Sequence, residues 1–111
     1  MSNQTASDIA FRAADHMSKA GHCKGKQVDE EGHVCFWGAL RSVAGYYSGL
    51  TETVAVIIDL TTIRETASDI LRETGRVAEP VTYNDRPGTT GEDVILLLKE
   101  TGARLRDTPD A

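Results

Sequence analysis

The sequence predicts a mainly α protein: a compact bundle of four to five helices, with an irregular loop or a short β-hairpin after the first helix. Apolar residues recur at spacings of three and four along most of the chain, which is the period of one helix face. Glycine and proline interrupt this pattern between segments of ordinary helix length. The 111 residues correspond to one domain. We expect a single helical domain at residues 7–105, with tails at 1–6 and 106–111.

The first helix is expected to start at Ser7, because serine is a common capping residue, and to end at Gly21, because glycine favours the position after a helix C-terminus. Its apolar face contains Ile9, Ala13, Met17 and Ala20. Residues 22–34 should then form the loop. Within it, 27–28 and 33–34 are candidates to pair as a short hairpin.

A second helix is expected from about Cys35 to Tyr47. Helical spacing favours the joint burial of Trp37, Leu40, Ala44 and Tyr47. We therefore interpret Trp37 as a core anchor rather than as a stacking platform.

Residues 51–74 form the longest helical pattern. Its inner face is expected to contain Val56, Leu60, Ile63, Ala67 and Ile70. Thr62 and Glu65 match a capping box, so this segment is either one helix or two.

The connector at residues 76–88 contains two prolines and precedes the last helix. Thr89 or Thr90 should cap that helix, with Glu92 or Asp93 completing a capping box. Its inner face is expected to contain Val94, Leu97, Leu98, Thr101 and Leu105.

The formal net charge is −5, and residues 27–74 carry three basic against eight acidic side chains. No basic stripe is present to neutralise phosphates, which argues against a nucleic-acid partner. The longest apolar patch, Val54–Leu60, is far shorter than the roughly 18 residues of a membrane helix. The N-terminus lacks the basic and apolar regions of a signal peptide. We therefore expect a cytoplasmic protein with reduced thiols and no membrane partner.

Residues 21–40 contain both cysteines, two of the three histidines and the only tryptophan. The alternative zinc ligands in this block are His22, Cys23, His33 and Cys35. Their spacing argues against that site, because each pair is adjacent or separated by one residue instead of the usual two to four. We therefore expect no metal or cofactor, with zinc as the alternative.

A second polar cluster consists of Asn84, Asp85 and Arg86. These side chains are candidates to bind a ligand or a partner. Turn chemistry alone also explains them, because Asn and Asp bond to backbone amides that follow them in the chain. We favour the structural role and keep the three residues as the candidate binding site.

Three blocks resemble a family of small uncharacterised proteins, a domain of unknown function, from actinobacteria and their phages. The blocks are Gly-His-Cys-Lys-Gly at 21–25, Gly-His-Val-Cys-Phe-Trp-Gly-Ala-Leu at 32–40, and Tyr-Asn-Asp-Arg-Pro-Gly-Thr-Thr-Gly-Glu-Asp-Val at 83–94. The family pattern commonly has Trp where this chain has His22 and Tyr83, which weakens a four-ligand metal site. The resemblance implies no activity and no catalytic residues. It implies an accessory phage or actinobacterial protein.

The leading hypothesis is a non-enzymatic protein of unknown function that acts through protein–protein interaction. Its partner would be an unidentified protein, in the host cytoplasm if the chain is phage-encoded. A homo-oligomer is a further hypothesis, because Val54, Ile57 and Ile58 lie off the inner face of their helix. The alternative is a small metal-binding or hydrolytic enzyme that uses the His22–Cys35 loop, for example Cys35 beside His33.

Overall fold

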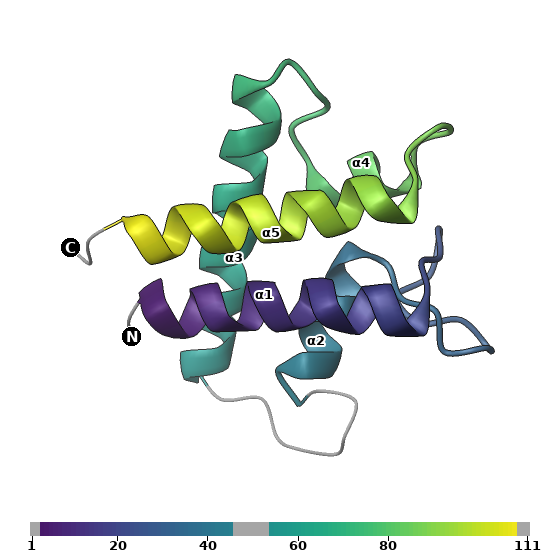
Figure 1. Cartoon of the computed structure of the whole chain (residues 1–111), viewed down its shortest axis with the longest axis horizontal. Helices are drawn as coiled ribbons and strands as arrows, with labels where there is room; N and C mark the ends of the chain where they lie inside the picture. The colour runs from purple at the N-terminus through teal and green to yellow at the C-terminus, as the bar shows by residue number, and fades with distance from the viewer. Residues whose placement is uncertain (1–2, 46–53, 109–111) are drawn as a thin grey trace.

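The computed structural model describes residues 3–45 and 54–108 and contains five helices in this range. They are α1 (Asn3–Ala20), α2 (Phe36–Val43), α3 (Val54–Glu73), α4 (Pro80–Asp85) and α5 (Gly91–Asp107). Helices α1 and α5 lie side by side in opposite directions, and α3 crosses behind both of them (Figure 1). The loops that follow α1 and precede α5 gather at one end of this pair (Figure 1). The mainly helical fold class is thus confirmed.

No strand forms within the described ranges, so the predicted hairpin is wrong. Single bridges join Val34 to Val28 and to His22 instead. The amide of Val34 donates to the carbonyl of Gly21 at 2.9 Å, and its carbonyl accepts from the amide of Cys23 at 3.0 Å. The amides of Cys35 and Asp29 donate to the carbonyls of Gln27 and His33, both at 3.0 Å, so the pairing of the two segments is limited to one antiparallel bridge and does not extend into strands.

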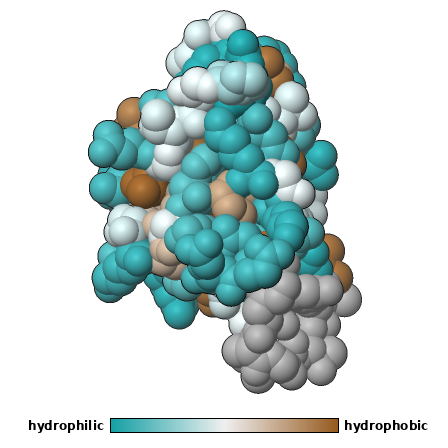
Figure 2. All heavy atoms as spheres, turned by 90° about the vertical axis from the view of Figure 1, so that its right-hand side faces the viewer, coloured by the Kyte–Doolittle hydropathy of each residue, from teal (hydrophilic) through white to brown (hydrophobic). Residues whose placement is uncertain are grey.

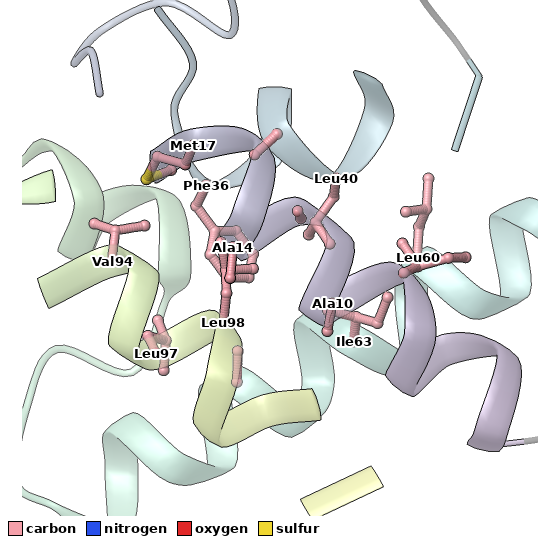
Figure 3. Packing of buried hydrophobic residues seen from close by; sticks show 14 of the residues in the cluster. Ala10, Ala14, Met17, Phe36, Leu40, Leu60, Ile63, Val94, Leu97 and Leu98 are labelled. Atoms are coloured by element: carbon pink, nitrogen blue, oxygen red, sulfur yellow. The ribbon is translucent and has the colours of Figure 1, made fainter. Parts of the chain in front are cut away.

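One apolar core joins α1, α2, α3 and α5 (Figure 3). Phe36 of α2 is completely buried and lies near Ala14 of α1 and Leu98 of α5 (Figure 3). The small residues of α1 let its neighbours approach closely; they are Ala6, Ala10, Ala13 and Ala14. Burial of apolar surface in this cluster is the main force that holds the helices together.

Ser7 does not cap α1. The helix begins at Asn3, four residues before its predicted start at Ser7. Its side chain is buried, and its hydroxyl donates to the carbonyl of Gly102 in α5 at 2.7 Å. A serine that bonds to a neighbouring helix and a serine that caps its own helix therefore look the same in the sequence. Gly21 does terminate the helix, with a φ of +99° and its amide bonded to the carbonyl of Met17 at 2.9 Å.

Helix α3 is one continuous helix, so the capping box predicted at Thr62 is not used. The hydroxyl of Thr62 donates to the carbonyl of Ile58 at 2.9 Å, which is the bond of a threonine inside a helix. The predicted inner face is buried at Leu60, Ile63, Ala67 and Ile70, with Val56 half-buried. Ile57 and Ile58 are 49% and 46% exposed, in agreement with their position off this face.

Helix α2 is shorter than predicted. Cys35 is its N-cap rather than its first residue, and Val43 is its last residue. Phe36 takes the core position, while Trp37 is half-buried; Tyr47 lies outside the described residues. Neighbouring residues on a helix are rotated by about 100°, and here Phe36 points into the core while Trp37 packs against its edge.

The predicted start of the last helix is confirmed. The Thr90 hydroxyl accepts from the amide of Asp93 at 3.2 Å, and the Asp93 carboxylate accepts from the amide of Thr90 at 2.9 Å. The predicted inner face of α5 is buried at all its positions. None of the helices described is both long and apolar enough to span a bilayer. The end of the molecule that carries the loops is mostly hydrophilic (Figure 2).

Gly38 of α2 allows the loop backbone to pass directly beside the helix. A Cβ atom at this position would lie 1.9 Å from the carbonyl oxygen of Gln27. We predict that Gly38→Ala lowers the free energy of unfolding by about 3 kcal/mol, because neither backbone can move away without breaking the loop. Urea denaturation measures this loss.

Gly102→Ala is the matched control, since the nearest atoms to its Cβ would belong to the side-chain ring of Phe11, at 3.0 Å. A ring can shift more easily than a backbone, so we expect a loss of less than about 1 kcal/mol for this variant. Equal losses in the two variants would contradict the close loop contact at Gly38.

Candidate functional site

Asn84 is the centre of a polar network between the loop after α1 and helix α4. Its side chain is completely buried. Its oxygen accepts from the amide of Phe36 at 3.0 Å and contacts Nε2 of His22 at 2.9 Å. Its nitrogen donates to the carbonyl of Cys23 at 3.1 Å and to the carboxylate of Asp85 at 2.9 Å. All the polar atoms of this amide are thus used in holding the loop.

The backbone partners of Asn84 fix the proton on His22. The amide of Phe36 can only donate and the carbonyl of Cys23 can only accept, so the orientation of the Asn84 amide is determined. The Asn84 oxygen can only accept, and therefore His22 carries a proton on Nε2. His22 is a structural donor in this arrangement.

Asp85 extends the network to the tip of the loop. Its Oδ1 accepts from the side chain of Asn84 and from the amide of Gly25 at 3.1 Å. Lys24 donates to the carbonyl of Arg86, which ties the same loop to the end of α4. Helix α4 begins at Pro80, and the side chain of the preceding residue, Glu79, caps its N-terminus. The three candidate binding residues are therefore adjacent, with Asn84 buried and the other two exposed.

Asp29 shapes the other half of the loop. Its Oδ1 accepts from the amides of Glu31 and His33 at 3.0 and 2.9 Å, and its Oδ2 contacts Nδ1 of His33 at 3.0 Å. Desolvation opposes ionisation of Asp29, but these hydrogen bonds outweigh it and lower its pKa. The His33 ring packs against Gly21, where a Cβ would lie 2.5 Å from it. His33 is thus fixed between Asp29 and the end of α1.

The four alternative zinc ligands have separate surroundings. Cys23 donates to the carbonyls of His33 and Lys26 at 3.3 and 3.4 Å. Cys35 accepts from the amide of Gly38 at 3.4 Å as the cap of α2. Among the residues that the structure describes, no three His, Cys, Asp or Glu side chains are grouped so that they could hold one metal ion.

Both thiols are held in the protonated form. Burial raises the pKa of Cys23 to about 11, with the nearby Cys35 and Asp29 adding to the effect. Burial also raises the pKa of Cys35, although its cap bond to Gly38 opposes the shift. Because the thiolate is the nucleophile, this environment lowers the reactivity of both thiols at neutral pH.

Trp37 lines four neighbouring hollows of about 150, 230, 240 and 600 Å³. Two of them run along one face of α3, which presents Ile57, Thr61, Arg64, Glu65, Ser68, Asp69 and Arg72. We call this α3 face together with Trp37 the Trp37 surface. Its charged side chains are partly paired, with Arg72 at 2.8 Å from Asp69 and Arg64 at 3.7 Å from Glu79 of the connector.

Sequence reasoning placed Trp37 in the core and missed this surface. The signal was present, because the α3 residues concerned recur at spacings of three and four along the side of the helix next to its buried face. It was masked by their mixed polarity, which is also typical of an ordinary solvated helix face.

We predict that Asn84→Ala lowers the free energy of unfolding by about 3 kcal/mol, because buried partners in both segments lose their hydrogen bonds. Asn84→Asp should be at least as damaging, since it places a buried acceptor against the carbonyl of Cys23 and the carboxylate of Asp85. Denaturant titration measures both losses.

Asp85→Asn is the matched control, because an amide oxygen can still accept from Gly25. We expect it to change stability by less than about 1 kcal/mol. A loss below this value for Asn84→Ala would contradict the central role of Asn84.

The native thiols should react slowly with iodoacetamide. With a pKa of about 11 in place of the ordinary 9.0, Cys23 has about 100-fold less thiolate at pH 8. Between pH 8 and 10 its labelling rate should rise about tenfold per pH unit, because the pH stays below this pKa. Mass spectrometry follows the rate, and urea-unfolded protein is the control. Native labelling that levels off near pH 9 would show that the thiol is not shifted.

No curated protein and no solved structure matches this chain. A family model does match, described as a family of unknown function, DUF6197, and it covers residues 1–104. The matched range includes the loop after α1, helix α4 and the polar network that joins them. This chain therefore belongs to the DUF6197 family of unknown function.

Proposed function

We propose that this chain is a non-enzymatic protein that binds another protein through the Trp37 surface. The observation that supports this most directly is the position of Trp37, half-buried and bordering four hollows. Tryptophan is enriched among the residues that contribute most to binding energy at protein interfaces. A partly exposed indole between concave areas can accept apolar side chains of a partner without a rearrangement of the core.

The composition of the Trp37 surface also favours a protein partner. Ile57 is 49% exposed at one end of it, and both signs of charge are present on α3, for example at Arg64 and Glu65. Reversible interfaces combine apolar and aromatic residues with charged ones, and this surface contains both kinds. A second copy of this chain is one such partner, since Ile58 is also exposed next to Ile57.

Binding is favoured over hydrolysis or metal chemistry because the candidate reactive groups are occupied. His22 donates to Asn84, His33 contacts Asp29, and the thiols have raised pKa values. The phage or actinobacterial context implied by the sequence blocks is part of this proposal, with a host protein as the partner.

Ile57→Asp tests the proposal because it places a charge at an exposed point of the Trp37 surface. We expect at least about a tenfold loss of affinity for a stoichiometric partner, identified by cross-linking and mass spectrometry and measured by calorimetry with purified protein. If light scattering shows that the wild type is a dimer, the same variant should be a monomer.

Leu96→Asp is the matched control, since Leu96 is 55% exposed on α5 and does not line any of the four hollows. It should bind like the wild type. Equal affinity of the Ile57 variant and the wild type, or an equal loss in the Leu96 variant, would refute binding through the Trp37 surface.

A further inference from the structure

The smallest of the four hollows is a pocket between the loop after α1, α2 and α4. Its volume is about 150 Å³, and its walls include Trp37, Val81, Cys35 and Asp85. It is smaller than the pockets of roughly 300 Å³ or more that enclose whole drug-sized ligands. The end of one long side chain matches this size.

The chemistry of the walls is that of a cation site. An indole attracts a cation through the negative face of its ring. A carboxylate accepts charge-assisted hydrogen bonds from ammonium or guanidinium groups. Asp85 uses Oδ1 for Asn84 and Gly25, and within the described ranges no donor contacts its Oδ2. The pocket therefore combines an aromatic wall with an open carboxylate oxygen.

Lys26 also lines the pocket and would repel a cation. Its ammonium is bound to the carboxylate of Glu30, an exposed residue of the same loop that does not line the pocket. This pairing reduces the field of Lys26 in the pocket. Lys26 and Asp85 are the charged residues of the lining, so the pairing of Lys26 with Glu30 leaves Asp85 as the uncompensated charge of the wall, which favours a cation over an anion.

We propose that this pocket binds the cationic end of an arginine or lysine side chain, with Trp37 and Asp85 as the binding residues. This inference rests on the proposed function, because Trp37 belongs both to the pocket and to the interaction surface. The partner would insert one basic side chain here while its apolar residues contact the α3 face. Cys35 contributes a neutral, polarisable wall, in keeping with its raised pKa.

The only tryptophan of the chain provides the readout. N-acetyl-arginine amide is titrated at constant ionic strength while the emission of Trp37 is recorded. The neutral isostere N-acetyl-citrulline amide is the matched control ligand. We expect a saturable change with the arginine compound, and at least about tenfold weaker binding of the citrulline compound, because the Asp85 carboxylate selects for charge.

Asp85→Asn is the matched variant, since it retains an acceptor for Gly25 but removes the negative charge. It should bind the arginine compound at least about tenfold more weakly while its thermal midpoint stays unchanged. Lys26→Gln should bind it more tightly, because a like charge has been removed. N-acetyl-aspartate tests the opposite preference, and tighter binding of this anion would overturn the proposal.

A linear, non-saturating quench would indicate collisions only and would refute the site, as would equal binding of the arginine and citrulline compounds. Ile57 does not line the pocket, so Ile57→Asp should leave the arginine titration unchanged. If the arginine compound binds but Ile57→Asp does not weaken the binding of any protein partner, the proposed function alone is refuted. If Ile57→Asp weakens the binding of a partner but the arginine compound does not bind, the cation pocket alone is refuted.

Discussion

The buried side chain of Asn84 is the interaction on which the rest of this structure depends. The loop after α1 has backbone groups with no helix or strand partner, and leaving them unsatisfied in the interior would be costly. Asn84 supplies an acceptor for the amide of Phe36, which begins α2, and a donor for the carbonyl of Cys23. An aspartate could not do both, because it lacks the donor. One amide thus attaches an irregular segment to a helical bundle.

This attachment also determines what α2 presents to the core and to solvent. With the amide of Phe36 bonded to Asn84, the Phe36 ring enters the core between α1 and α5. The next residue is rotated by about 100° on the helix, which turns Trp37 toward α3 and the surface. The same hydrogen bond therefore positions both the largest fully buried side chain of the described residues and the centre of the candidate interface. The packing of the core and the position of Trp37 are thus coupled through a single residue.

Sequence reasoning succeeded where the determining contacts are local. The helical periodicity of α3 and α5 and the capping box at Thr90 are read from neighbours within one or two turns. It failed where a residue type serves a distant contact, as Ser7 does across to α5, or where a motif lies inside a longer helix, as at Thr62. The role of Asn84 depends on partners 48 to 62 residues away, so turn chemistry gave its region but not its function.

The physical difference between a reactive site and a structural network lies in which groups are left open. Catalysis by His22 or Cys23 would require a free base or a stabilised thiolate, but one donates to Asn84 and the other is protonated well above neutral pH. The loop after α1 therefore uses residues typical of catalysis to satisfy its own backbone. Among the described residues, no donor contacts the Oδ2 oxygen of Asp85, which lies at the boundary between this network and Trp37. Recognition should accordingly take place at this boundary, where a rigid network supports an aromatic side chain and a charge.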